Sequence, residues 1–238
     1  MNPDPALYVL GLTWFVVFLF STTLHEAGHA FAAYKLGDPT AYEGGQVSLN
    51  PWPHIQREPF GMVLLPIISF AATQGGWMMG WASAPYDPTW AHRYPRRAAL
   101  MAAAGPAANL LLVVISGLAI RAGILGGVLE PPFNLNFTRI VAGVEGTWGE
   151  AAAVPLSILF SLNLLLFVFN LIPFPPLDGS AILPAVMSDS TARRYQELLH
   201  QPMFSLIGLL AAWKIFPLIS SPILMLALKL LYPEAGYQ

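Results

Sequence analysis

Among the stretches that contain no acidic or basic residue, two are clear candidates for membrane-spanning helices. Residues 98–120 and 151–172 are both uncharged and mainly apolar. A helix needs about 20 such residues to cross the hydrocarbon core of a bilayer. The whole chain agrees, because only 10% of its 238 residues are charged, against about 25% in soluble domains, and its mean hydropathy is +0.58. The sequence therefore predicts a protein that crosses the membrane several times.

The remaining segments predict further helices, some of them broken. A first helix is expected over 6–36, because Gly37 and Pro39 supply a stop signal. Residues 60–84 are apolar but interrupted at Pro66 and at 73–77. Residues 188–201 are polar and predict a surface helix.

We expect an all-α polytopic membrane protein, a bundle of about 4–6 membrane helices with a re-entrant segment. The run GQVSL at 45–49 predicts a short β-element after the first helix, which could pair with an unfolded substrate. The chain is expected to form one membrane-embedded domain over 1–238, with a core at about 6–187 and a C-terminal apolar segment at 203–232 that is broken at Pro217 and Pro222.

Composition excludes several classes of function. The chain has no cysteine, which excludes disulfides, thiol catalysis and thiolate metal sites. Its net charge of −2 provides no basic face for a nucleic acid. The N-terminus lacks the basic region of a secretory signal, so we expect no cleavable signal peptide.

The first helix carries ionisable residues where apolar ones are expected, in the order His25-Glu26-x-x-His29. Positions i and i+4 of a helix lie on one face, so the two imidazoles can bind one zinc ion. The glutamate beside them can act as the general base on a water molecule. The alternative is a histidine pair that is hydrogen-bonded inside the bundle. The cost of burying such groups in hydrocarbon favours a metal ion.

A zinc protease needs a third protein ligand. Asp178 is the only carboxylate between Ala151 and Met187, and it lies in the interrupted segment FPPLDGS. The alternative for this aspartate is a helix cap in a surface loop. The other candidate ligands are histidines, at positions 54, 92 and 200.

Two motifs together carry a family resemblance. The sequences LHEAGHAFAAYKLGDPTA and NLIPFPPLDGSAIL resemble the site-2 protease family of intramembrane zinc metalloproteases, in its compact form without PDZ or CBS domains. The blocks VSLNPWPHI, EPFGMVLLP and AAGPAANLLL are similar to that family too, and the resemblance covers about residues 10–190. It implies that His25, His29 and Asp178 hold Zn²⁺ and that Glu26 is the base. The family's HID reads His-Ile-Gln at 54–56 here.

Three other polar residues are interpreted with alternatives. Asn170 precedes the proline-rich break, and its amide could bind a substrate carbonyl or a developing oxyanion, or satisfy backbone freed by Pro173. Asn109 follows a run of small residues and is interpreted as a hydrogen-bonding contact between helices, with a catalytic role as the alternative. His54 is interpreted as a loop residue or a donor to a ligand.

The parity of the membrane crossings depends on residues 60–84. The metal motifs at 25–29 and 178 can meet only if this segment returns to the face that it left. A hairpin that turns near 74–76 puts seven basic residues on the catalytic face, at positions 35, 57, 93, 96, 97, 193 and 194. It puts two on the opposite face, at positions 121 and 139. The positive-inside rule then predicts a catalytic face toward the cytosol.

These features predict a metalloprotease that cuts a peptide bond in or near a transmembrane segment of a membrane protein substrate, in the plasma membrane of a prokaryote. The alternative is a non-catalytic zinc-binding membrane protein, such as a carrier or a client-binding pseudoprotease. A membrane peptidase that cuts soluble peptides is a further alternative.

Overall fold

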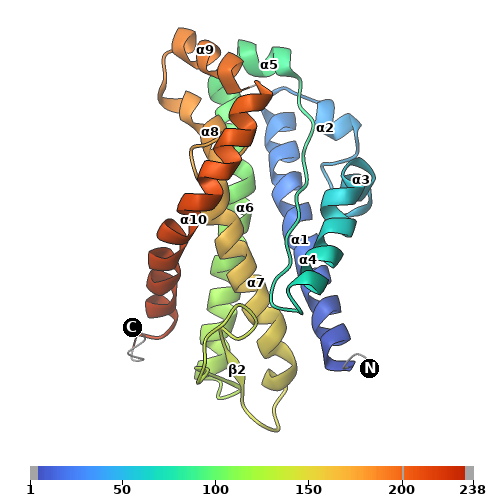
Figure 1. Cartoon of the computed structure of the whole chain (residues 1–238), viewed down its shortest axis with the longest axis vertical. Helices are drawn as coiled ribbons and strands as arrows, with labels where there is room; N and C mark the ends of the chain where they lie inside the picture. Colours follow the sequence, from blue (N-terminus) through green and yellow to red (C-terminus); the bar gives the residue numbers. More distant parts are fainter. Residues whose placement is uncertain (1–4, 200, 234–238) are drawn as a thin grey trace.

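Four long apolar helices run along the molecule in the computed structural model, which describes residues 5–199 and 201–233 (Figure 1). They are α1 (Pro5–Leu36), α6 (Pro95–Leu125), α7 (Gly149–Asn170) and α10 (Pro202–Leu231). Each has at least 22 residues and is apolar enough to cross a membrane. Within the described residues this confirms the predicted all-α multi-pass protein.

The helices α1, α6 and α7 form the centre of the bundle, and α10 lies at its side. In the most apolar 18-residue stretch of each helix, 56% is buried in α7 and only 11% is buried in α10. The helices α1 and α6 approach closely because small residues face each other. A Cβ atom at Gly28 would lie 3.0 Å from the carbonyl oxygen of Ala104. Small residues are the usual means of close packing between membrane helices.

The interrupted segment forms the predicted hairpin. A π-helical turn η1 (Phe60–Leu64) leads into α4 (Leu65–Ala72), and an extended segment then returns over 77–87 (Figure 1). The turn between them has positive φ at Gln74 (53°) and Gly75 (87°). The two arms are joined where the Trp81 amide donates to the carbonyl of Gly61, at 3.1 Å. The whole segment therefore starts and finishes toward the same end of the bundle.

Short helices gather at the end where α1 finishes, and α9 confirms the predicted polar surface helix (Figure 1). They are α2 (Thr40–Glu43), α3 (Trp52–Arg57), α5 (Pro88–Arg93), α8 (Asp178–Ile182), the 3₁₀ turn η2 (Leu183–Val186) and α9 (Asp189–Leu199).

The β-element predicted at 45–49 is wrong. These residues form turns and bends, because their backbone is satisfied locally rather than by a partner strand. The Gln46 amide donates to the Ala41 carbonyl at 2.9 Å, and the Ser48 carbonyl lies 3.2 Å from His54 Nε2. The described sheet joins β1 (Leu129–Glu130) to β2 (Ala142–Gly143) in antiparallel register, in the loop between α6 and α7.

The break predicted at Pro217 and Pro222 is also wrong, because α10 continues through both prolines. A proline removes one backbone hydrogen bond, and it bends a membrane helix more often than it ends it. The helix changes direction part-way along its length (Figure 1).

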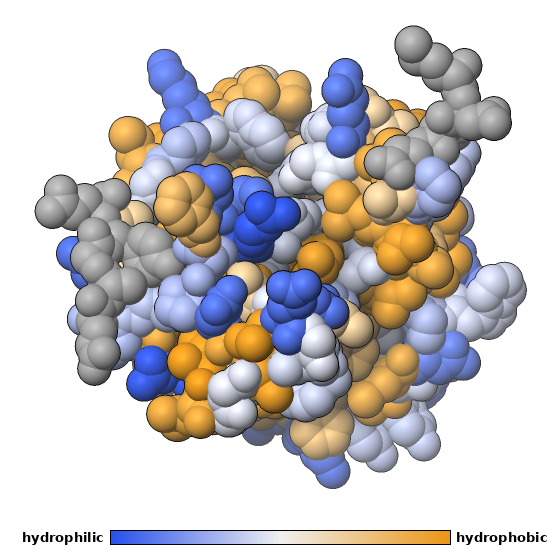
Figure 2. Space-filling view, turned by 90° about the horizontal axis from the view of Figure 1, so that it is seen from below, coloured by the Kyte–Doolittle hydropathy of each residue, from blue (hydrophilic) through white to orange (hydrophobic). Residues whose placement is uncertain are grey.

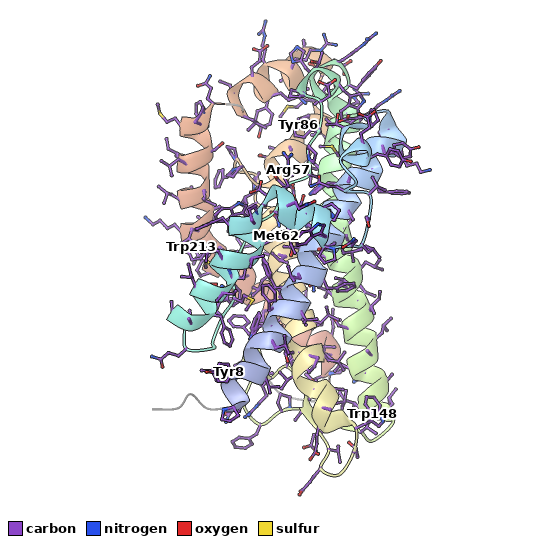
Figure 3. All side chains as sticks on the ribbon, turned by 90° about the vertical axis from the view of Figure 1, so that its right-hand side faces the viewer. Tyr8, Arg57, Met62, Tyr86, Trp148 and Trp213 are labelled. Atoms are coloured by element: carbon purple, nitrogen blue, oxygen red, sulfur yellow. The ribbon has the colours of Figure 1, made fainter. Side chains whose placement is uncertain are left out.

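Aromatic residues lie toward both ends of the molecule. Tyr8 and Trp148 lie near one end and Tyr86 lies toward the other (Figure 3), as expected for aromatic residues at membrane interfaces. Seen from the end that holds the loop between α6 and α7, hydrophilic and hydrophobic residues are mixed (Figure 2). The loop's cavity of about 830 Å³ is lined by residues that include Glu130 and Arg139.

Candidate metal centre

His25 and His29 lie one turn apart on α1, and both are buried, with 7% of each residue exposed. Their Nε2 atoms are 3.0 Å apart. Asp178 Oδ2 lies 3.1 Å from His25 Nε2 and 3.4 Å from His29 Nε2. Among the described residues this is the group of three histidine and carboxylate side chains that could hold a metal ion. Side chains 149 residues apart in the sequence thus converge on one point.

The loop after α7 places Asp178 against the histidines. Leu177 is buried among apolar residues of the loop and α10, including Ile172 and Ala212. Gly179 allows α8 to pack on the end of α7, since a Cβ atom there would lie 2.5 Å from the carbonyl oxygen of Ile172. In the sequence Leu-Asp-Gly, the leucine therefore anchors the loop in the apolar core, the aspartate is the candidate ligand, and the glycine allows the close backbone approach.

The outer ring nitrogens of both histidines are hydrogen-bonded. His29 Nδ1 lies 2.8 Å from the carbonyl oxygen of Met101, and His25 Nδ1 lies 2.6 Å from Asn109 Oδ1. A carbonyl oxygen only accepts, so Nδ1 of His29 carries a hydrogen, and in the neutral imidazole that binds a metal ion the lone pair is then on Nε2, the atom nearest Asp178. Hydrogen bonds of this kind orient the imidazoles of metal sites.

The donor set fits a zinc ion. Asp178 Oδ2 is buried and has no hydrogen-bond partner within the described structure. Zinc bonds of about 2.0–2.1 Å at tetrahedral angles separate ligand atoms by about 3.3 Å, and the three distances here are 3.0, 3.1 and 3.4 Å. Gly105 keeps the space open, because a Cβ atom there would lie 2.6 Å from His25 Nε2 and closer still to His29 Nε2.

Asp178 is the most exposed of the three candidate ligands. Its side chain is 20% exposed, against 8% for each histidine side chain. Zinc binding requires an ionised carboxylate and neutral imidazoles, so protons and the metal ion compete for these three side chains.

Glu26 is buried beside the cluster on α1, with 5% of the residue exposed. Successive residues of a helix point about 100° apart, so Glu26 lies on the face next to that of the two histidines. The side chain can thus act near the metal position without sharing the direction of the ligands.

Residues 13–210 match peptidase family M50. The chain belongs to this family. Its curated relatives include YwhC of Bacillus subtilis (strain 168), which is 34% identical over 170 residues, or 71% of this chain and 66% of YwhC. Rip2 of Mycolicibacterium smegmatis is 31% identical over 179 residues, and Rip2 of Mycobacterium tuberculosis is 33% identical over 175; each alignment covers 74% of this chain and 57% of Rip2. All of these relatives are named as zinc metalloproteases.

M50 membership confirms the predicted resemblance to the site-2 protease family, and the group of His25, His29 and Asp178 agrees with the expectation of Zn²⁺. The chain spans somewhat more than half of the length of the curated relatives that it matches. No solved structure matches it.

The other predicted histidines lie outside the cluster of His25, His29 and Asp178. His54 is 1% exposed and its Nε2 lies 3.2 Å from the Ser48 carbonyl oxygen. The outer nitrogens of both cluster histidines are already bonded to Asn109 and Met101, so no described hydrogen bond supports His54 as a donor to either ligand. His200 lies outside the described residues.

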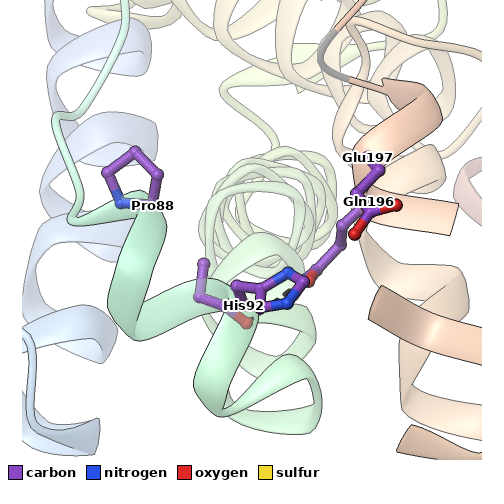
Figure 4. Close-up of a pocket in the computed structure, with 5 residues that line it drawn as sticks. Pro88, His92, Gln196 and Glu197 are labelled. Atoms are coloured by element: carbon purple, nitrogen blue, oxygen red, sulfur yellow. Dashed lines mark hydrogen bonds between the residues drawn. The ribbon is translucent and has the colours of Figure 1, made fainter. Parts of the chain in front are cut away.

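His92 is exposed and borders a separate cavity of about 350 Å³ between α5 and α9 (Figure 4). Pro88, Gln196 and Glu197 also line that cavity, and Gln196 Nε2 joins the two helices by donating to the Ala91 carbonyl at 3.3 Å. These elements supply none of the three cluster side chains.

The hydrogen bonds of the asparagines differ from the prediction. Asn109 is the expected contact between helices, but its partners include a metal-site histidine. Asn170 donates to the carbonyl of Leu166 at 3.1 Å, a bond within its own helix. Asn163 was missed, although an amide inside an otherwise apolar helix is itself a signal of function. Gly105 was missed as a site residue because an absent side chain leaves no chemical signature.

Proposed function

We propose that this chain is an intramembrane zinc metalloprotease, which hydrolyses a peptide bond in or near a transmembrane segment of another membrane protein. The observation that carries the proposal is the convergence of His25, His29 and Asp178 inside a bundle of membrane helices, with Glu26 buried beside them. The substrate is therefore expected to be reached from the membrane rather than from bulk water.

In this proposal each residue has a separate role. His25, His29 and Asp178 would hold the zinc ion, which, when bound, makes a water molecule more acidic and polarises a carbonyl. Glu26 accepts a proton from the attacking water and passes it to the nitrogen of the leaving peptide. Burial of Glu26 shields this transfer from bulk solvent.

Asn170 is proposed to bind the substrate carbonyl. Its amide nitrogen carries two hydrogens, so the bond to the Leu166 carbonyl leaves one for a carbonyl or a developing oxyanion. The residue ends α7, eight positions before Asp178 in the chain. Asn170→Ala is expected to lower kcat more than it raises KM, and equal effects on zinc content and kcat would contradict this role.

A helical substrate must unwind before cleavage, because its carbonyls are bonded within its own helix. The described chain has irregular backbone in two apolar places, the hairpin return over 77–87 and the loop between α7 and α8. Irregular backbone is tolerated at membrane depth where it is buried in protein or lines a cavity. We propose that the unwound substrate lies next to these segments.

The catalytic end is proposed to face the cytosol. The short helices and the seven basic residues counted above lie toward the end of the bundle where α1 finishes, while Arg121 and Arg139 lie toward the other, where Lys229 adds a third. In the cysteine-free chain, Thr89→Cys and Glu145→Cys place one thiol at each end. An impermeant reagent on intact cells should label Glu145→Cys alone, and labelling of Thr89→Cys alone would reverse the orientation.

The direct test uses the purified chain in lipid vesicles with a single-span membrane protein. A soluble peptide with the sequence of the cut region serves as the matched substrate. We expect fragments that end within or next to the membrane segment, abolished by a zinc chelator and restored by added zinc. Cleavage of the soluble peptide alone would favour a peptidase for soluble substrates. Zinc binding without any cleavage would favour a carrier or a client-binding protein.

A further inference from the structure

Two asparagines with no part in the proposed mechanism are buried at the centre of the bundle. Asn109 on α6 and Asn163 on α7 are both 0% exposed. A polar amide in such a place destabilises the fold unless its hydrogen bonds are made. Their bonding partners therefore indicate what the two residues do.

Four hydrogen bonds join three helices in a circuit. His25 Nδ1 lies 2.6 Å from Asn109 Oδ1, and Asn109 Nδ2 donates to Asn163 Oδ1 at 2.8 Å. Asn163 Nδ2 then donates to Ser21 Oγ at 2.9 Å and to the Leu159 carbonyl at 2.8 Å. The circuit begins and ends on α1, at positions one turn apart.

The direction of every bond in the circuit follows from one backbone group. The Leu159 carbonyl can only accept, so the nitrogen of the Asn163 amide must face it. Asn163 Oδ1 then faces Asn109, which must present its own nitrogen. Asn109 Oδ1 is left for His25, whose Nδ1 must carry the hydrogen. This removes the usual ambiguity of amide and histidine orientation.

We propose that Asn163 and Asn109 form a hydrogen-bond relay from the Leu159 carbonyl to His25. The relay fixes the hydrogen of the His25 imidazole on Nδ1 and leaves the lone pair on Nε2. The proposal rests on the metal site proposed above, and it makes both asparagines positioning residues for a zinc ligand. His29 receives the same setting directly from the Met101 carbonyl. The position of the hydrogen on His25 depends on side chains, whereas on His29 it depends on a backbone carbonyl. A side-chain substitution can therefore change the first but not the second.

The test compares zinc affinity, measured by chelator competition, in four purified variants. Asn109→Leu removes the acceptor for His25. Asn109→Asp keeps an oxygen facing His25 Nδ1 and serves as the conservative rescue. Asn163→Leu leaves the neighbour of His25 in place but removes the fixed direction of its amide. Ser116→Ala is the control, because Ser116 is 0% exposed on the same helix and bonds only to carbonyls of that helix among its described partners.

Asn109→Leu should bind zinc about 10–100-fold more weakly, as expected when an outer hydrogen bond to a metal ligand is lost. Asn163→Leu should show a smaller loss in the same direction. Asn109→Asp cannot donate to Asn163 Oδ1, but its carboxylate still accepts from His25 Nδ1, so its zinc affinity should stay closer to that of the wild type than the affinity of Asn109→Leu does. ¹⁵N spectra of zinc-loaded, histidine-labelled protein should show the Nδ1 hydrogen of His25 in the wild type and in Asn109→Asp.

The proposal is overturned if Asn109→Leu binds zinc as tightly as the wild type, or if Ser116→Ala weakens zinc binding equally. If Asn109→Leu does not fold, Asn163→Leu decides, and unchanged zinc affinity in that variant counts against the relay. His25→Ala separates this outcome from failure of the metal site. Full zinc retention in His25→Ala would contradict the proposed metal site itself. Zinc loss in His25→Ala, with no effect of substituting either asparagine, would contradict only the relay.

Discussion

Helix α6 has two halves that face different interiors. Its first half, up to Asn109, faces the metal cluster through Met101, Gly105 and Asn109. Its second half faces an apolar core that includes Val113, Ile120 and Phe160. One half therefore packs against polar side chains of α1, and the other packs against α7, the loop before α7 and the end of α10.

The difference shows which part of the bundle stabilises the fold. Apolar packing stabilises the second half without special geometry, and the residue that follows α10 is held there by the hydrogen bond from the Tyr232 hydroxyl to the Ile140 carbonyl, at 2.8 Å. The first half buries ionisable groups that cost free energy in a membrane unless each is paired or bound to a metal. Substitutions in the two halves should therefore separate metal binding from stability.

The largest effect is expected from Asp178→Ala. It removes the only carboxylate of the cluster, so zinc content should fall from about one per chain to near zero, since a structural or catalytic zinc site needs at least three protein ligands. Asp189→Ala, an exposed acidic residue of the next helix, is the matched control and should keep its zinc. Metal analysis of both variants checks the prediction, and full zinc in Asp178→Ala would remove that residue from the ligand set.

Gly105→Ala should come next. Its methyl group would occupy the space between the two Nε2 atoms, so the protein should lose most of its zinc although every ligand remains. Gly117→Ala is the control on the same helix, because a Cβ atom there would lie 3.4 Å from Phe160, an ordinary contact. Equal zinc content in the two variants would show that the space at Gly105 is not needed for the metal.

Phe160→Ala should have the opposite profile. Phe160 is 3% exposed in the apolar core, and truncation of a buried phenylalanine costs about 3–5 kcal/mol in soluble proteins. Thermal denaturation should occur at a lower temperature, while zinc per folded chain stays at the wild-type level. Leu118→Ala, at a side chain that is 65% exposed, should change neither property. Loss of zinc in folded Phe160→Ala would contradict the separation of the two halves.

Much of this contrast was predictable from the sequence, because hydrocarbon allows few backbone solutions. The uncharged runs predicted α6 and α7. The spacing of His25 and His29 predicted that both side chains lie on the same face of one helix. The strand at 45–49 failed because five β-like residues form no strand without a partner. The bonds of Asn109 to His25 and Asn163 depend on how three helices cross, and no local pattern contains that information.

The central claim is that the polar half of the bundle is a catalytic metal site rather than a metal store, and Glu26 tests it most directly. Glu26→Gln keeps the size of the side chain and removes only its ability to accept a proton. Zinc content and cleavage of a single-span membrane substrate should be measured on the same preparation, with a chelator control. The account predicts wild-type zinc and a rate lower by about 10²–10⁴-fold, the usual contribution of a general base. Fragment yields equal to those of the wild type would contradict it.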